Sequence, residues 1–449
     1  TIIEIPAQVP GGVQLDYANF HHWGDYNYGE NARQYDGLED MYWLYKTHVH
    51  LPSDIESKDI FLVAKGIDYE FEIRFNDEII WYQEGMFTPV EIDITNKIQR
   101  NNTIEVLIYP APKRKGATVH NREEADQSCK PAVSYGWDWH PYLVALGIWD
   151  EFYLDIREEK RIENCELFYT LSEDYSSAFI HFKTTATIHD TIEYTIYNRN
   201  DEKVISTTEP NFELKNPRLW WCNGQGEPYL YTWTARLCNA ESMVRGRVGF
   251  RNIELTMNNN DWKAKDGTRA YPPMTITLND RAIFAKGSNW VNPEIFPGII
   301  KEETYEPLIK LAKEANMNIF RVWGGAIINK DCFYELCDEY GIMVWQEFPL
   351  ACNNYVGTEK YLKVLEHFLK RYGAEKKVII TRAPGRVNLM GRHVEHRGGN
   401  VNVISIDKEV ICVASPNPSE VTVTNTCSDY AEGKFSIEEF FKNINWDNW

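Results

Sequence analysis

The spacing of apolar residues changes at about residue 280, and this change constrains the fold more than any other feature. Before that point, apolar and polar residues alternate in short runs, which is the period of half-buried β-strands. Beyond it, the extended runs "RAIFAKGSNW", "NIFRVWGG" and "IMVWQEFP" are separated by stretches with helical spacing. Alternating strands and helices with short connections predict right-handed βα units on a parallel sheet.

Apolar stripes define the helices between these strands. The first stripe consists of Tyr305, Leu308, Ile309, Ala312 and Ala315. The second consists of Phe333, Leu336, Cys337 and Tyr340, and Gly341 is the residue expected to end that helix. A third helix is expected from Thr358 to Tyr372. Three such units correspond to the first part of a (β/α)₈ barrel, which needs at least about 200 residues when complete.

The chain as a whole is expected to be multidomain, with all-β domains followed by α/β structure. Residues 1–156 contain short strands, with "FNDEII" as a hairpin turn and "NNTIEVLIYPAP" as a strand ended by prolines, and predict a jelly-roll-like β-sandwich. Residues 157–256 have the strand spacing of an immunoglobulin-like β-sandwich. Residues 260–362 hold the three barrel units, and residues 365–449 form a partial α+β segment.

Composition limits the partners that such a chain would bind. The net charge of −19 argues against nucleic acid or an anionic membrane, whereas a small neutral ligand is compatible with it. No apolar run approaches the roughly 20 residues that span a bilayer, so no membrane partner is expected. The nine cysteines lack the spacing of metal ligands, and no metal site is expected. Compartment and oligomeric state stay open.

Four segments carry a more specific pattern. They are "SYGWDWHPYLVALGIW", "KGSNWVNPE", "NIFRVWGGA" and "FYELCDEYGIMVWQEFPLACNN". Together they resemble glycoside hydrolase family 2, and within it the β-mannosidase branch, over about residues 1–361. The resemblance implies a terminal β-linked mannose as the substrate, a small carbohydrate as the partner and no cofactor for this part of the chain.

The ends of the expected barrel strands supply candidate binding residues, because such ends converge on a common mouth. The candidates are Asn289 and Trp290 after the first strand, Arg321 and Trp323 after the second, and Glu347 and Asn353 after the third. Arg and Asn can donate hydrogen bonds to sugar hydroxyls, and Trp offers a stacking face. The resemblance places these residues around the sugar ring and makes Trp137, Asp138 and Trp139 a loop that reaches into the mouth.

Each of these candidates also has a purely structural alternative. Trp290 and Trp323 could pack at the rim of the sheet, and Arg321 could form a structural ion pair with Glu347. Asp138, which lies between two tryptophans, could cap a turn.

The catalytic carboxylates are the missing part of the pattern. A retaining glycosidase needs two carboxylates about 5–5.5 Å apart. The resemblance implies a Glu after an Asn at the end of the fourth barrel strand and another Glu after the seventh, and neither motif follows Tyr361. We therefore assign no catalytic residue and expect no glycoside hydrolysis by this chain alone.

A second pattern follows the third βα unit. The segment "RAPGRVNLMGRHVEHRGGNVNVISIDKEVICVASP" resembles the start of galactokinase-like sugar kinases of the GHMP superfamily, over about residues 365–449. A strand enters a Pro-Gly turn that is expected to expose backbone, and glycines let the chain pass close to a ligand. We assign a sugar loop to Arg386, Asn388, His393, Glu395, Gly398 and Gly399. The two histidines could instead be ordinary turn residues, and metal binding by them is not expected.

The second resemblance is also incomplete. Arg392, Glu395 and His396 depart from the acid and the His-x-Asp-Tyr of galactokinases, which leaves the sugar open. No Gly- and Ser-rich nucleotide loop occurs before Trp449, so ATP and Mg²⁺ are expected only for a complete kinase. The two patterns meet between Val356 and Glu366, by a natural fusion or by the joining of two incomplete genes, and "KKVIITRAP" could pair where a fourth barrel strand would lie. The alternative functions are a non-catalytic carbohydrate-binding protein and a sugar-kinase fragment.

Overall fold

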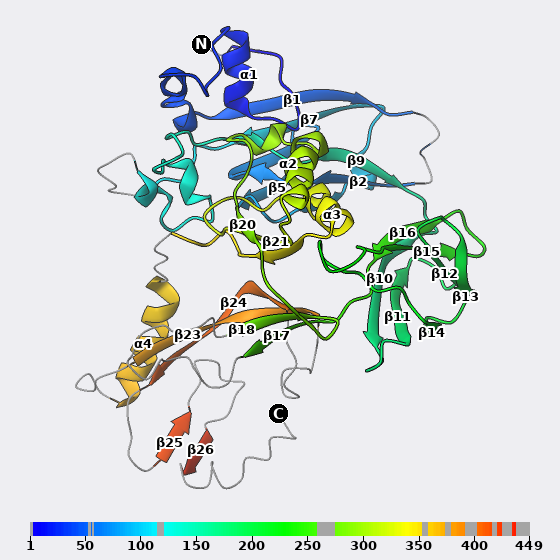
Figure 1. Cartoon of the computed structure of the whole chain (residues 1–449). Coiled ribbons are helices and arrows are strands. Elements are labelled where there is room, and N and C mark those ends of the chain that lie inside the picture. Colours follow the sequence, from blue (N-terminus) through cyan, green and yellow to red (C-terminus); the bar gives the residue numbers. More distant parts are fainter. Residues whose placement is uncertain are drawn as a thin grey trace. The chain divides into compact units, whose positions relative to one another are not determined.

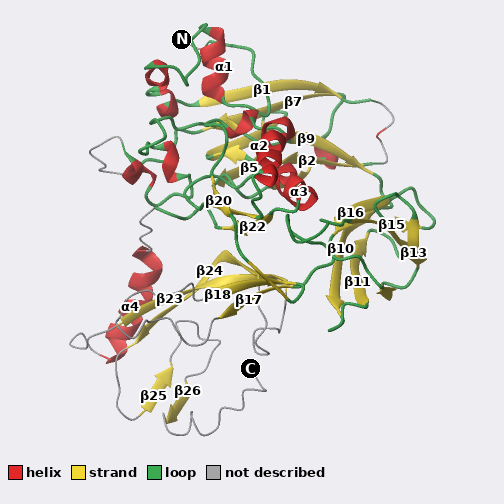
Figure 2. Cartoon of the chain, viewed as in Figure 1, coloured by secondary structure: helices red, strands yellow, loops and turns green. Residues whose placement is uncertain are grey.

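The computed structural model describes residues 3–52, 55, 58–114, 121–257, 274–352, 358–372, 379–390, 402–414, 420–423 and 433–436. It divides into two compact units (Figure 1). The first consists of Thr1–Ile253 with Ile276–Tyr355, and the second of Glu254–Thr275 with Val356–Trp449. The described chain is built mainly from β-strands, as Figure 2 shows. The expectation of a multidomain, mostly β protein is therefore confirmed.

Two antiparallel sheets form the N-terminal part of the first unit. One has the order β1-β7-β4-β5, from β1 (Trp43–His50), β4 (Glu70–Phe75), β5 (Glu78–Glu84) and β7 (Asn101–Ile108). The other has the order β6-β2-β9, from β2 (Asp59–Ala64), β6 (Val90–Asp93) and β9 (Phe152–Arg157). The short strands β3 (Ile67–Asp68) and β8 (Gly147–Ile148) pair separately.

Alternating apolar side chains hold these two sheets together. Phe71, Ile73 and Phe75 of β4 are each no more than 1% exposed, and they share one core with Leu62 of β2. The turn between β4 and β5 is the expected hairpin, because Asn76 and Asp77 adopt positive φ angles of 50° and 66° that Asn and Asp tolerate in such turns. One helix, α1 (Val13–Phe20), precedes the sheets. Short 3₁₀ turns are Asn31–Tyr35, Leu38–Asp40, Thr95–Lys97, Arg122–Ala125, Ala132–Ser134 and Pro297–Ile299.

A second pair of antiparallel sheets follows. The sheet β10-β11-β14 contains β10 (Ile162–Leu171), β11 (Ser177–Ala186) and β14 (Asn211–Lys215). The sheet β13-β12-β15-β16 contains β12 (Ile192–Tyr197), β13 (Lys203–Thr207), β15 (Tyr231–Leu237) and β16 (Met243–Val248). Phe182 of the first sheet stacks on Tyr194 of the second, with ring centroids 4.6 Å apart, so the two sheets enclose one aromatic core.

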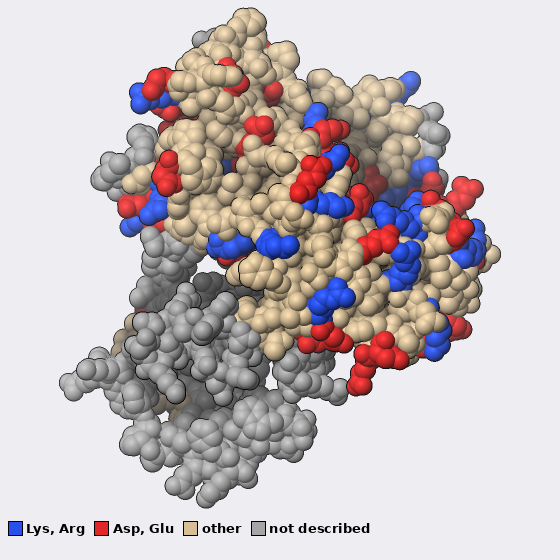
Figure 3. All heavy atoms as spheres, in the orientation of Figure 1, with Lys and Arg blue, Asp and Glu red and all other residues tan. Residues whose placement is uncertain are grey.

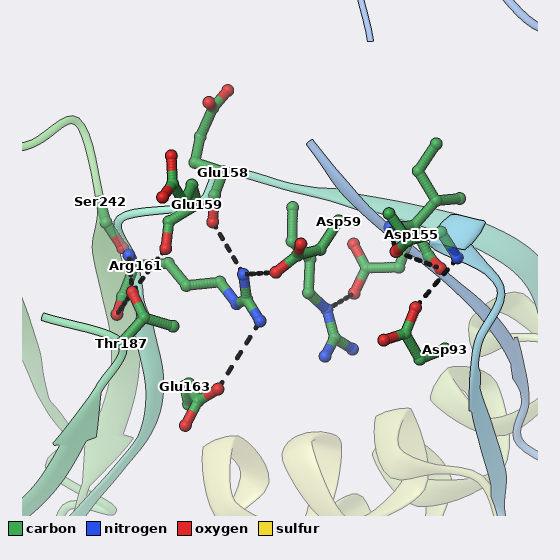
Figure 4. A network of polar contacts seen from close by, with 12 residues as sticks. Asp59, Asp93, Asp155, Glu158, Glu159, Arg161, Glu163, Thr187 and Ser242 are labelled. Carbon is green, nitrogen blue, oxygen red and sulfur yellow. Dashed lines mark hydrogen bonds and ion pairs between the residues drawn. The ribbon is translucent and has the colours of Figure 1, made fainter. Parts of the chain in front are cut away.

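The linker between the two sandwiches is anchored by Arg161 (Figure 4). Its Nη1 donates to Asp59 Oδ2 of β2 at 2.6 Å and to the Glu158 carbonyl at 2.9 Å. Its backbone N–H donates to Thr187 Oγ1 at 2.9 Å, and that hydroxyl in turn donates to the Glu159 carbonyl at 2.6 Å. The Arg161 side chain is only 12% exposed. Through these hydrogen bonds, this one residue ties the linker to both sandwiches.

The three extended runs that define the βα units form a parallel sheet. Its order is β20-β21-β22, from β20 (Gly287–Trp290), β21 (Ile319–Val322) and β22 (Met343–Gln346), with helices α2 (Glu302–Glu314) and α3 (Asp331–Tyr340) between them. The register aligns Asn289 with Arg321 and Arg321 with Trp345. This parallel pairing is the one that the alternation of strands and helices predicts.

The run "RAIFAKGSNW" is not one strand, as the sequence pattern suggested, but two. Strand β19 (Arg281–Ile283) pairs antiparallel with β18 (Met274–Leu278), and β20 starts four residues later. The buried side chain of Asn318 occupies the break: Nδ2 donates to the Phe284 carbonyl at 3.0 Å, and Oδ1 accepts from the Lys286 N–H at 2.9 Å. Those backbone groups are therefore satisfied without a continuous ladder. A further strand, β17 (Ile253–Met257), precedes this region.

The helices agree with the predicted stripes only in part. In α2, Tyr305, Ile309 and Ala312 are buried, but Leu308 is 41% exposed and Ala315 caps the end of the helix. The buried stripe is narrower than expected because the helix covers only a three-stranded sheet. Gly341 ends α3 in the left-handed conformation, with φ 77°, as predicted.

The second unit contains helix α4 (Thr358–Tyr372) and two strand pairs. Strand β23 (Ile379–Met390) pairs antiparallel with β24 (Asn402–Ala414), and β25 (Glu420–Val423) pairs with β26 (Gly433–Ser436). The expected turn at Pro384 and Gly385 is wrong, because the chain continues through them with a register shift at that point. Such a bulge tolerates a proline, which cannot donate to the ladder. Strands β23 and β24 form a two-stranded sheet.

Among the described residues, no helix combines the length and the apolar character that a membrane span requires. Acidic and basic side chains alternate over the described surface that Figure 3 shows, without a broad field of one sign.

Candidate functional site

An ion pair lies where two neighbouring parallel strands end. Arg321 of β21 donates through Nε to Glu347 Oε1 at 2.7 Å, and its Nη2 lies 2.6 Å from the same oxygen. The two side chains are 35% and 26% exposed, so solvent still screens the pair. The other carboxylate oxygen of Glu347 accepts from the Gly324 N–H at 3.0 Å. Glu347 is thereby held in one orientation at the carboxyl edge of the sheet.

Asn289 joins this pair from the adjacent strand β20. Its Oδ1 accepts from Arg321 Nη1 at 3.1 Å. Because Oδ1 serves as the acceptor, the Asn289 amide nitrogen is left as a donor beside a cation and a carboxylate. Asn289, Arg321 and Glu347, which we call the polar triad, offer hydrogen-bond donors and an acceptor within one small area. Sugar hydroxyls need both kinds of partner.

Aromatic rings from the first sandwich meet the end of β21 next to the triad. The ring centroid of Trp323 lies 5.2 Å from that of Trp137 and 6.4 Å from that of Trp139. The loop that carries Trp137 and Trp139 is closed by a hydrogen bond from the Trp137 N–H to the His140 carbonyl at 2.9 Å. Asp138 is exposed within this turn, and Trp139 is 51% exposed. The fold thus brings together a loop and a strand end that are about 180 residues apart in the sequence.

Trp290 lies in the core beside the sheet and not at the mouth where the sequence predicted it. Its side chain is only 8% exposed, and its ring lies 4.9 Å from Phe320 and 4.8 Å from Phe333. Its Nε1 donates to Asn329 Oδ1 at 3.0 Å. Trp290 is therefore a core residue in this structure, which fits the packing alternative rather than a stacking face.

Sequence reasoning overlooked Trp345. This residue is 55% exposed, lies in register with Arg321, and has its ring centroid 6.0 Å from the Arg321 guanidinium carbon. The signal was present in the spacing, because Trp345 and Glu347 are two residues apart at the end of one strand.

A cavity of about 220 Å³ lies beside the loop that carries Trp137 and Trp139, and of the predicted site residues it is lined by Trp139. Trp139 and His140 line one side, and Asn292 and Glu294 line another. Burial lowers the pKa of His140, which favours its neutral form near pH 7. Asn292 Oδ1 accepts from the Ile327 N–H at 3.0 Å, while its buried Nδ2 has no partner among the described residues. The cavity therefore presents an unused amide donor.

The remaining candidates cannot be placed at this site. Asn353 lies outside the described residues, as do His393, Glu395, Gly398 and Gly399. Arg386 and Asn388 lie on β23, where the backbone continues as a strand. No group of three or more His, Cys, Asp or Glu side chains suited to a metal ion occurs within the described ranges.

Comparison with known proteins shows what the parts of this chain are similar to. Residues 2–150 match the glycosyl hydrolase 2 galactose-binding domain-like family, and residues 150–251 match glycosyl hydrolases family 2. Residues 366–416 match the galactokinase galactose-binding signature. The chain thus carries glycosyl hydrolase family 2 domains followed by a galactokinase signature.

The relatives within that class are β-mannosidases. The chain is 28% identical to β-mannosidase B of Emericella nidulans over 386 residues, which cover 80% of this chain and 45% of that protein. It is 27% identical to the β-mannosidase of Capra hircus over 412 residues, again covering 80% of this chain and 45% of the relative. The chain therefore spans less than half the length of these curated relatives.

Solved structures agree with this similarity. The crystal structure of β-D-mannosidase from Dictyoglomus thermophilum matches with a TM-score of 0.67 and 29% identity, over 82% of this chain and 48% of that one. A β-D-glucuronidase structure for the same organism matches with a TM-score of 0.58 and 18% identity, over 82% of this chain and 60% of that one. The second likeness concerns the fold alone.

Proposed function

We propose that the first unit binds the terminal β-linked mannose of an oligosaccharide at the polar triad, with Trp137, Trp139 and Trp323 beside it. The observation that carries this proposal is the meeting of an Arg, an Asn and a Glu with the exposed Trp139 and two half-buried tryptophans at one edge of the parallel sheet. Neutral sugars need directional hydrogen bonds and an apolar ring surface together. The similarity to β-mannosidases supports mannose over other hexoses.

In this proposal the polypeptide binds mannosides and does not hydrolyse them. Glu347 is the only carboxylate in the polar triad, and it is occupied by Arg321 and the Gly324 N–H. One carboxylate that is held by a cation does not supply both a general acid and a nucleophile.

The test separates binding from turnover. We would titrate the full chain with β-1,4-linked mannobiose by calorimetry and follow release of mannose over the same period. Saturable heat without released mannose is the expected result, and Arg321→Met should weaken the binding. Release of mannose by the purified chain, lost in Glu347→Gln, would overturn the non-catalytic part. Absence of binding, with the fold intact by circular dichroism, would overturn the proposal as a whole.

A second candidate function rests on the match of residues 366–416 to the galactokinase galactose-binding signature. We propose that this segment binds a hexose. Titration with galactose should then give binding that survives Arg321→Met. A chain that does not bind galactose would contradict this proposal.

A further inference from the structure

The outer face of the sheet β10-β11-β14 carries two rows of side chains that the mannoside site does not use. Along each of these strands, alternate residues face the core and the solvent. The register places Phe168, His181 and Asn211 in one row and Thr170, Phe179 and Glu213 in the next. Strands β10 and β11 lie side by side in Figure 1, in the second sandwich.

Two phenylalanines on this face are unusually exposed. Phe168 is 37% exposed and Phe179 is 50% exposed, although both lie within regular strands. They occupy adjacent strands and adjacent rows, which makes them diagonal neighbours about 7–8 Å apart. Exposed apolar rings gathered on one face can mark a contact surface, which makes this face a candidate.

The face is hollowed between these rings. A depression of about 490 Å³ is lined by both phenylalanines, by His181 and Asn211, and by Thr170 and Glu213. This volume falls within the range of small-molecule sites, which is roughly 300–1,000 Å³. The depression is therefore large enough for a sugar ring and its substituents.

Polar side chains around the rings are held in place by their neighbours. His181 Nδ1 and Asn211 Oδ1 are 2.7 Å apart, so the imidazole N–H donates to the amide oxygen. This leaves His181 Nε2 as an acceptor and the Asn211 amide nitrogen as a donor. Lys215 lies 2.5 Å from Glu213 and lowers the pKa of that carboxyl group, which stays ionised as an acceptor at neutral pH.

We propose that this depression is a second carbohydrate site, which binds a neutral hexopyranoside through the rings of Phe168 and Phe179. The apolar face of the sugar would cover the two rings, and its hydroxyls would meet His181, Asn211 and Glu213. The expectation that the sugar is a mannose oligosaccharide rests on the proposed function of the first unit. The location of the site does not, because it follows from the contacts on this sheet.

Other ligand classes fit these groups less well. A nucleic acid would need cations to meet its phosphates, but on this face Lys215 is paired with Glu213, and Lys183 stands opposite Glu166 in the register. An apolar ligand would displace water from the Asn211 amide nitrogen without offering that donor a new partner. A neutral polyhydroxylated ring uses both the apolar surface and the polar groups.

The imidazole of His181 provides a local signal for the test. With histidine labelled in the full chain, its ring resonances would be assigned by comparison with His181→Gln and followed while β-1,4-linked mannotetraose is added. We expect a saturable shift with millimolar affinity. Phe179→Ala should weaken the association about fivefold, which is the scale of one aromatic contact.

Two variants separate this site from others. Tyr153→Ala removes an exposed aromatic ring from β9, on the first sandwich. It should leave unchanged the shift of the His181 resonances on addition of mannotetraose. Arg321→Met should also leave it unchanged while weakening the mannoside site, so failure of one site is distinguishable from failure of the other. A His181 signal that does not move, or a shift that is the same in Phe179→Ala, would refute the second site.

Discussion

Replacing Glu347 by Gln tests the polar triad with little change in shape. The substitution keeps the side-chain volume but removes the charge that Arg321 Nε and Nη2 contact at 2.7 and 2.6 Å. A fully exposed ion pair contributes about 0–1 kcal/mol, and this pair is partly shielded, so we expect a loss of about 1 kcal/mol in the free energy of unfolding. The loss for mannoside binding should be larger, about 1–3 kcal/mol, because the ligand also loses a charged acceptor.

Urea unfolding and calorimetric titration of the same samples would measure these two quantities. A double-mutant cycle with Arg321→Met should give a coupling energy of about 1 kcal/mol for stability. Glu78→Gln is the matched control, because Glu78 forms an exposed ion pair with Lys97 at 2.7 Å on the first sandwich, away from the triad. If Glu347→Gln behaves like Glu78→Gln in both assays, then the triad neither stabilises the sheet edge nor binds the sugar.

Three further predictions concern other parts of the first unit. Trp323→Ala should weaken mannoside binding about tenfold in the same titration, since its ring joins those of Trp137 and Trp139. Burial raises the pKa of Asp16 from 3.8 to about 6. The contribution of this carboxyl group to stability is therefore present below about pH 4 and is lost as the pH rises to about 6. Urea unfolding should show a fall of up to about 3 kcal/mol in the free energy of unfolding over this range, and Asp16→Asn should abolish the fall. In limited proteolysis followed by mass spectrometry, the two sandwiches should survive while the region after about residue 260 is cut early, because its parallel sheet has open edges; equal resistance throughout would contradict this.

Local sequence signals anticipated the elements whose structure depends on a few neighbouring residues. The Asn76-Asp77 hairpin and the helix end at Gly341 follow directly from the backbone conformations that these residue types tolerate. The parallel order of β20, β21 and β22 followed from the alternation of strands and helices.

Features that depend on distant contacts were harder to anticipate. Only the side chain of Asn318 explains why the chain breaks at Phe284, and the bulge at Pro384 depends on pairing with β24. Trp290 ends β20 in register with the buried Val322, one position beyond the pair of Asn289 and Arg321, and it packs against Phe333 of α3. The direction of a side chain at a strand end depends on register, which a single sequence determines poorly.

The cavity beside Trp139 illustrates the same limit. It is formed by a loop of the first sandwich and two strand-end loops, which lie far apart in the sequence. Its lining comes from several of the quoted motif segments, but their meeting around one cavity and the unused donor Asn292 Nδ2 become visible only in the folded chain.

The anchored linker at Arg161 has a consequence for binding longer chains. Arg161 bonds to both sandwiches, and the polar triad and the depression on β10-β11-β14 lie in the same compact unit. When both proposed sites bind sugar, a polysaccharide that reaches both gains avidity, while one too short to span them gains none. Affinity should therefore rise abruptly at a threshold chain length, and a flexible substitution such as Arg161→Gly should blur that threshold.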